Sequence, residues 1–223
     1  MRVIAIDGPA GAGKSTIARA LAERLGLEYL DTGAMYRAVT FAAMRRGIHP
    51  DDQEAVAKIV VDLPMDVSDA GVFVDGVDAT VEIRGREVTA AVSAVAANSA
   101  VRAELRERQR QWARVRGGGV IEGRDIGSVV FPDAILKLYL TASPRVRAQR
   151  RHGDVGGDID EIERSIVERD RRDLSRQDGP LQTTPDARVV DTSGLAVGEI
   201  VDTLVALVTD AEATLARAGR EAP

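Results

Sequence analysis

The fold of this chain is decided near its first residue, by the stretch Gly8-Pro9-Ala10-Gly11-Ala12-Gly13-Lys14-Ser15-Thr16. Directly before it, the apolar run at residues 3–7 is typical of a buried strand. Directly after it, residues 17–25 repeat apolar side chains at helical spacing. A strand, a glycine-rich turn and a helix are the context in which the pattern G-x-x-x-x-G-K-S forms a phosphate-binding P-loop. We therefore expect an α/β fold that begins with a P-loop.

The residue types of this stretch suit a bound nucleoside triphosphate. Glycines allow backbone N–H groups to approach phosphate oxygens without Cβ clashes, and the helix that follows directs its positive end at them. Lys14 would neutralise the β- and γ-phosphates, and the hydroxyl of Ser15 would be a ligand of Mg²⁺. We expect residues 8–16 to bind ATP with Mg²⁺. The competing interpretation is a glycine-rich turn that binds nothing.

Composition narrows the class of protein. The chain has 223 residues, 44% of them hydrophobic, with a net charge of −5 and no cysteine. This length fits one domain over residues 1–223. No apolar run is long enough for a membrane span, and a negative net charge disfavours nucleic acid as a partner. We expect a cytoplasmic monomer that contacts neither membrane nor nucleic acid.

The rest of the pattern alternates strands with helices, so we expect a parallel sheet flanked by helices. Strands are predicted at 27–30, 120–122, 134–141 and 188–191. Helices are predicted at 51–61, at 86–116 with a break near 98–99, at 159–173 and at 195–218. Asp75-Gly76 within 72–80 predicts a hairpin, which would be a small antiparallel insertion. Residues 117–119, three consecutive glycines, are predicted to end the preceding helix flexibly. Residues 152–158 are rich in glycine and aspartate and lie between arginines, so they are predicted to be the mobile loop of a lid.

Arginines follow three of the predicted strands, those at 27–30, 120–122 and 134–141, the last of which precedes Arg145. Arg37 begins the helix after the second strand, and Arg124 and Asp125 follow the strand at 120–122. The carboxyl ends of parallel strands meet at one crevice, so a second phosphate is expected there. With no clear N-K-x-D element for reading guanine, the chain is predicted to be a small-molecule kinase. Kinases for UMP or shikimate, and a P-loop module that acts as a switch, remain alternatives.

Further motifs resemble the bacterial cytidylate kinase family. The resemblance lies in the P-loop, in D-T-G-A-M-Y-R at 31–37, V-E-I-R at 81–84, E-G-R-D-I-G at 122–127, F-P-D-A at 131–134 and E-R-D-R-R-D at 168–173. It implies transfer of the γ-phosphate of ATP to CMP or dCMP, with Mg²⁺. It also implies that the hairpin belongs to the segment that binds the monophosphate. The stretch 152–158 is shorter and richer in glycine than this family's lid.

The resemblance also implies roles for individual residues. The acceptor phosphate would be bound by Arg37 and Arg124, with Thr32 and Tyr36 beside them. The cytosine would be read by Ser93, Arg102 and Arg176. The ribose would contact Asp173, together with Arg169. Arg150 and Arg151 would be lid arginines near the transferred phosphate. Together with Lys14 of the P-loop and Arg124 they would assist transfer, and Asp125, from its place at the crevice, is expected to orient the substrate or its arginine partners.

Overall fold

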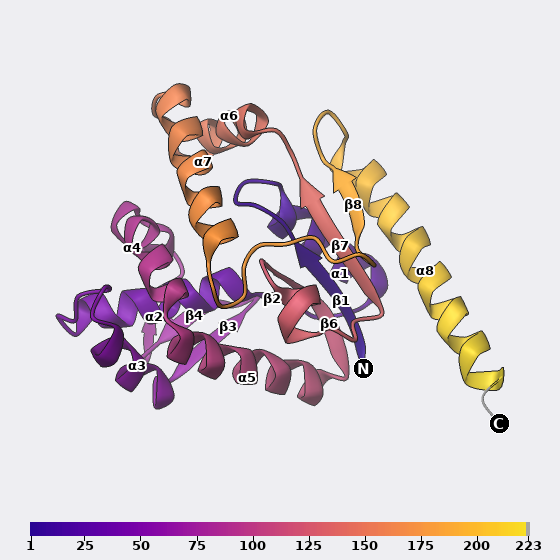
Figure 1. Cartoon of the computed structure of the whole chain (residues 1–223), viewed down its shortest axis with the longest axis horizontal. Coiled ribbons are helices and arrows are strands. Elements are labelled where there is room, and N and C mark those ends of the chain that lie inside the picture. Colours follow the sequence, from indigo (N-terminus) through magenta and orange to yellow (C-terminus); the bar gives the residue numbers. More distant parts are fainter. Residues whose placement is uncertain (222–223) are drawn as a thin grey trace.

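The computed structural model describes residues 1–221 and is built around one parallel sheet (Figure 1). Its five strands lie in the order β2-β6-β1-β7-β8. They are β1 (Arg2–Asp7), β2 (Tyr29–Asp31), β6 (Gly118–Gly123), β7 (Leu136–Thr141) and β8 (Arg188–Asp191). The expected parallel α/β architecture is confirmed. Every pair of neighbours is parallel, so all five strands end at the same edge.

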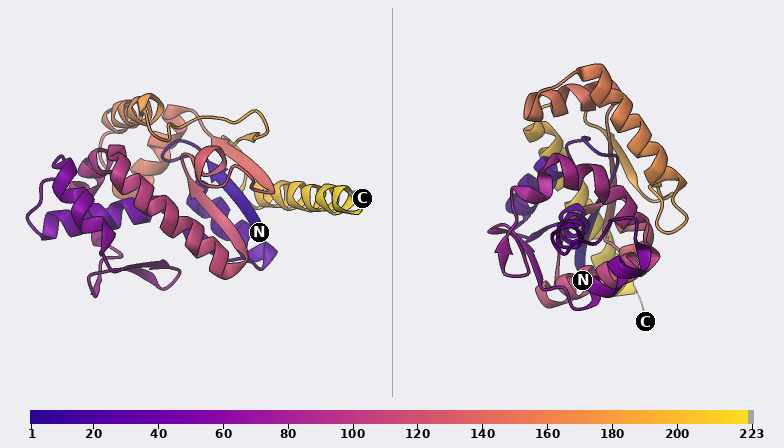
Figure 2. Two further views of the ribbon diagram at one scale, coloured as in Figure 1. Left: turned by 60° about the horizontal axis from the view of Figure 1, so that its bottom comes forward. Right: turned by 90° about the vertical axis from the view of Figure 1, so that its left-hand side faces the viewer.

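Helices cover both faces of the sheet, because β1 and β6 are apolar on both sides. On one face α1 (Lys14–Leu25) and α8 (Val197–Glu221) pack over Ile4, Ile6 and Val120. On the other, α2 (Thr32–Arg45) and α5 (Ser99–Arg116) pack over Ala5 and Ile121. The far end of α8 extends away from the sheet (Figure 2). Among residues 1–221 no helix is both long and apolar enough to cross a bilayer.

A second, antiparallel sheet lies between α3 (Gln53–Val61) and α4 (Arg86–Ala97) in the sequence. It contains β3 (Met65–Ser68), β4 (Gly71–Val74) and β5 (Val77–Asp78), and a short 3₁₀ turn, η1 (Glu82–Arg84), follows. The predicted hairpin is β4 and β5, joined at Asp75-Gly76 with positive φ at both residues. Strand β3 was not expected, because its short run M-D-V-S lacks a distinctive strand pattern.

Two helices, α6 (Pro144–Val155) and α7 (Ile159–Ser175), form the layer above the strand ends (Figure 1). The predicted loop at 152–158 is wrong for most of its length, since α6 continues to Val155 and only three residues separate the helices. Arg147 on α6 and Asp170 on α7 form a buried ion pair, Nη2 to Oδ2 2.6 Å. The two helices are therefore a packed hairpin.

The predicted flexible stop at 117–119 is also wrong in part. Gly118 and Gly119 are buried residues of β6, and only Gly117 ends α5. Both have φ above +140°, and a Cβ would clash with the Arg2 backbone at one and with the Trp112 ring at the other. Glycine is required here for close approach of neighbouring groups. A π-helical turn, η2 (Ile126–Val130), follows β6 and was not predicted.

Candidate active site

The P-loop joins the end of β1 to the first turn of α1, as the sequence predicts. Gly8, Gly11 and Gly13 all have positive φ, and a Cβ on Gly8 would clash with the carbonyl of Leu140 on the neighbouring strand. Lys14 is buried, and its Nζ donates to the carbonyl of Pro9, 2.8 Å away. The ammonium therefore lies inside the curve of the loop, where it can meet phosphate oxygens.

Glu122 is a residue of this site that sequence reasoning missed. It is buried in β6, opposite Asp31 of β2, and accepts a hydrogen bond from the hydroxyl of Tyr29. Burial, and then the charge of Asp31, raise the pKa of Glu122, whereas Lys14 and the Ser15 hydroxyl favour the anion. Burial, followed by Arg124, lowers the pKa of Lys14. An acidic residue near the carboxyl end of a buried central strand was the signal in the sequence.

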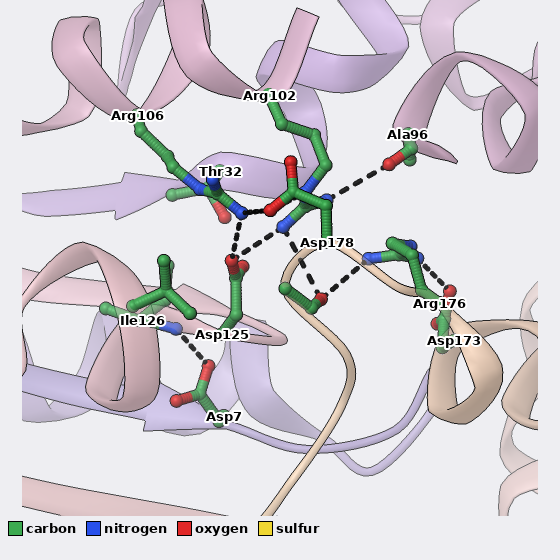
Figure 3. Close-up of polar contacts among 12 residues, drawn as sticks. Asp7, Thr32, Ala96, Arg102, Arg106, Asp125, Ile126, Asp173, Arg176 and Asp178 are labelled. Carbon is green, nitrogen blue, oxygen red and sulfur yellow. Dashed lines mark hydrogen bonds and ion pairs between the residues drawn. The ribbon is translucent and has the colours of Figure 1, made fainter. Parts of the chain in front are cut away.

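Asp7 connects the P-loop strand to the turn that carries Arg124 and Asp125 (Figure 3). Its Oδ1 accepts from the N–H of Ile126 and its Oδ2 from the N–H of Gly127, both at 2.8 Å. Burial is the main cause that raises the pKa of Asp7 to about 6, against the opposing effect of these two N–H groups. The residue was not among the predicted site residues.

A group of cations lies near the strand ends with few acidic partners. Arg37 donates to the carbonyl of Ile83 at 3.0 Å and to Thr89 Oγ1 at 2.8 Å, on the segment that follows the antiparallel sheet. Burial, and then Arg84 and Arg151, lower the pKa of Arg37 to about 10. Burial, followed by Arg124, lowers the pKa of Arg169 to about 10, and the buried Nε of Arg169 has no partner. Mutual repulsion of this kind favours a bound anion.

Arg124 belongs to this cationic group but also has an acidic partner. Its Nε donates to Oδ2 of Asp173 on α7 at 3.0 Å, and Asp173 pairs in turn with Arg176. Although burial opposes it, the charges of Arg124, Arg176 and Arg169 hold the pKa of Asp173 below its usual value. Thr32 Oγ1 donates to the carbonyl of Glu122 at 2.6 Å, which fixes the start of α2 against β6.

A second polar cluster surrounds Arg102, whose side chain is only 1% exposed (Figure 3). Its Nη2 donates to Oδ2 of Asp125 at 2.6 Å and its Nη1 to the carbonyl of Ala96 at 3.0 Å. The guanidinium carbon lies 5.5 Å from the centre of the Tyr36 ring. The Nε of Arg102 is buried and has no hydrogen-bond partner, although Oδ1 of Asp178 lies 3.9 Å away. An aromatic ring, a carboxylate and a free donor can together hold a planar polar ring such as a nucleobase.

The structure brings most of the predicted residues to one edge of the sheet, where the two predicted lid arginines have different neighbours. Arg151 lies near enough to Arg37 and Arg169 for its charge to lower the pKa of both. Arg150 instead donates to the Oγ1 and the carbonyl of Thr192, at 3.0 and 2.7 Å. Thr192 Oγ1 in turn donates to the carbonyl of Ala12, and Nη1 of Arg150 would lie 3.5 Å from a Cβ on Gly13, so Arg150 lies beside the P-loop. Ser93 is half-buried on α4, one turn before Ala96.

Arg147 is a further residue that the sequence did not single out. It is buried, and it donates to the carbonyl of Ala10 in the P-loop at 3.0 Å while pairing with Asp170. The α6–α7 hairpin is therefore joined directly to the phosphate loop. Nothing in the run of arginines from 145 to 151 distinguishes the inward-facing member, because helical spacing alone does not fix which side faces the loop.

Known proteins resemble this chain over most of its length. A sequence model of the family described as cytidylate kinase matches residues 4–210. The cytidylate kinase of Mycobacterium leprae (strain Br4923) is 49% identical over 211 residues, covering 92% of this chain and 95% of that protein. The bifunctional pantoate ligase/cytidylate kinase of Prochlorococcus marinus (strain MIT 9303) is also 49% identical over 92% of this chain, which spans only 44% of that relative.

Among solved structures, an uncharacterized protein from Eubacterium ventriosum ATCC 27560 superimposes with a TM-score of 0.55. It is 12% identical, and the match covers 94% of this chain and 99% of that one. At this identity the likeness concerns the fold alone.

Proposed function

Because the chain belongs to the cytidylate kinase family, we propose that it transfers the γ-phosphate of ATP to CMP or dCMP, giving ADP and CDP or dCDP. Residues 1–223 would act as one kinase domain, in the cytoplasm and as a monomer. The observation that carries the proposal is the pairing of two distinct polar sites at one sheet edge, the P-loop and the cationic group around Arg37 and Arg169. Two phosphate-bearing substrates need two such sites.

We assign the donor nucleotide to the P-loop, residues 8–16. The backbone N–H groups and Lys14 would bind and orient the β- and γ-phosphates. Ser15 would hold Mg²⁺ together with phosphate oxygens, and the neighbouring Glu122 carboxylate suits the same hard cation. Mg²⁺ would supply neutralisation of the charge that develops on the transferred phosphoryl group.

We assign the acceptor phosphate to Arg37 and Arg124, with Thr32 beside them. A phosphate monoester is already ionised, so its oxygen can attack without a strong base. The protein has to align the two phosphates and neutralise charge. Arg151 and Arg169 repel Arg37 in the free protein, so an anion between them would relieve that repulsion. Arg150, which lies against Thr192 and beside Gly13 of the P-loop, would approach the transferred group from the donor side.

We assign the acceptor nucleoside to the cluster of Arg102, Asp125, Tyr36 and Arg176, with Ser93 nearby. The Nε–H of Arg102, which has no hydrogen-bond partner in the free protein, can donate to N3 of cytosine, and the Asp125 carboxylate can accept from the amino group. Uracil carries N–H at position 3 and an oxygen at position 4, so it opposes both contacts. Asp173 can accept from a ribose hydroxyl.

A panel of acceptors tests the proposal. The purified protein is incubated with ATP and Mg²⁺ and with CMP, dCMP, UMP, AMP, shikimate or no acceptor, and ADP formation is measured. We expect turnover with CMP and dCMP at least 10²-fold above UMP in kcat/KM, on the order of what one opposed buried donor costs. Equal rates with UMP or AMP, or turnover only with shikimate, would reject the substrate. Nucleotide binding without acceptor turnover would indicate a switch module.

A further inference from the structure

Arg106 is a second, half-buried arginine at the nucleoside cluster, and no role in base reading was expected for it. It lies on α5 one turn after Arg102, and its Nη2 is 3.4 Å from Oδ2 of Asp125. The same Nη2 forms an ion pair with Asp178, in the segment that follows α7 (Figure 3). The pair is partly shielded from water, with side-chain exposures of 14% for Arg106 and 29% for Asp178. Ion pairs in such surroundings are screened less than surface pairs.

The segment 177–181 is held tightly against α5 by this pair and by its own backbone. Gly179 is buried and has a φ of +60°, and a Cβ there would clash with Nη2 of Arg102 and Oδ2 of Asp125. Leu181 is buried, and its N–H donates to the carbonyl of Asp173 at 2.9 Å. The backbone of this segment therefore lies directly against the cluster.

One carbonyl in the segment contacts both arginines that we assign to the base. The oxygen of Gly179 accepts from Nη1 of Arg176 at 3.3 Å and from Nη2 of Arg102 at 3.5 Å. Arg176 is further held by Asp173 on its other nitrogen. The orientation of Arg176 thus depends on the position of Gly179. Gly179 directly follows Asp178, which pairs with Arg106.

The balance of charge in the cluster also makes the position of Arg102 depend on Asp178. Asp125 receives both Arg102 and Arg106, and Asp178 Oδ1 also lies 3.9 Å from Nε of Arg102. Without the Asp178 charge, the guanidinium groups of Arg102 and Arg106 would compete for the one carboxylate of Asp125. Arg106 would then approach Asp125 more closely and displace Arg102 from its present hydrogen bond.

We propose that Arg106 and Asp178 are positioning residues that set acceptor-base specificity by docking the segment 177–181 onto α5 and so fixing the guanidinium groups of Arg102 and Arg176. Neither residue touches the base. The proposal rests on the proposed function, because it assigns Arg102 and Arg176 to the acceptor base.

The test compares Asp178→Asn, Arg106→Met and the double variant with the wild type, under initial-rate conditions with ATP, CMP and UMP varied in turn. We expect each single change to raise KM for CMP by about tenfold, the size of one lost charged contact, with kcat within about twofold. KM for ATP stays at the wild-type value, and the CMP-to-UMP ratio of kcat/KM falls by about tenfold. Because the pair acts as a unit, the double variant should be no worse than the more defective single variant.

Glu107→Gln and Arg114→Met are the matched controls, since these residues form an exposed ion pair on the same helix, away from the cluster. Both should behave as the wild type. Equal losses for CMP, UMP and ATP would show a structural role only and overturn the proposal, as would unchanged kinetics. A lower KM for CMP would also overturn it, because the segment would then be a competitor of the base. A wild type inactive with CMP would instead reject the proposed function.

Discussion

Replacing Asp7 by asparagine should change how the stability of the protein depends on pH. Asp7 is buried at the end of β1, and its two oxygens accept from the N–H groups of Ile126 and Gly127. Asparagine keeps one acceptor oxygen and cannot titrate. The variant therefore loses one of the two hydrogen bonds at every pH, and it also loses the proton equilibrium of the carboxyl group.

The size of the effect follows from the pKa of Asp7, which burial raises from 3.8 to about 6. A raised pKa means that the folded protein holds this proton more tightly than the unfolded chain does. The resulting stabilisation is complete below pH 3.8 and is lost as pH rises through about 6. Two pKa units correspond to about 3 kcal/mol, of which about 2 kcal/mol develops between pH 7 and pH 4.

Denaturant unfolding of both proteins from pH 4 to pH 7.5, followed by Trp112 fluorescence, measures this difference. On going from pH 7 to pH 4, the free energy of unfolding of the wild type should rise by about 2 kcal/mol relative to the variant. Asp69→Asn removes the same charge from an exposed ion pair with Arg19 and corrects for net charge. A constant difference between wild type and Asp7→Asn across this range would refute the reasoning, and so would a difference of opposite sign.

Three further predictions concern the substrates. Lys14→Ala should lower kcat on the order of 10²–10⁴-fold because the β- and γ-phosphates lose their buried cation; near-normal turnover of the folded variant would contradict this. Arg102→Met should lower kcat/KM for CMP more than for UMP, and an unchanged CMP-to-UMP ratio would remove Arg102 from the base site. The same variant should lose about 3–5 kcal/mol of stability, because the buried carboxylate of Asp125 keeps only the more distant Arg106 as a partner. Amide hydrogen exchange over residues 145–170 should slow when ATP and a CMP analogue bind together, and equal exchange with and without ligands would argue against a closing lid.

The main elements could be predicted because their signals are local. The P-loop, the alternation of strands and helices and the Asp75-Gly76 hairpin each lie within a few consecutive residues. Strand β3 and the turn η2 were not predicted, because neither short sequence has a pattern of its own and each depends on contacts with neighbouring elements. Gly118 and Gly119 were misread as a flexible stop because only the packed sheet shows that the Arg2 backbone and Trp112 approach so closely.

Site residues could be nominated from the sequence but not oriented. Arg150 and Arg151 are adjacent in the sequence, yet Arg150 contacts Thr192 whereas the charge of Arg151 lowers the pKa of Arg37. This difference depends on how α6 is rotated about its axis. Arg106 and Arg147 look like the other helix arginines and become distinct only through Asp178 and Ala10, far away in the sequence. Position along a helix predicts a shared face, and long-range packing decides what that face meets.

The direction of β1 has a practical consequence for experiments on single molecules. Arg2 opens this strand at the edge of the sheet opposite to the P-loop, and its side chain pairs with Glu212 of α8. In Figure 1 the first residue accordingly lies well away from the α6–α7 hairpin. A surface linker attached through Met1 would leave the P-loop, the arginine clusters and the hairpin facing solution. Immobilised molecules oriented in this way would present the proposed substrate-binding side uniformly, so that dyes placed on α7 and α4 could test the proposed closing of the lid.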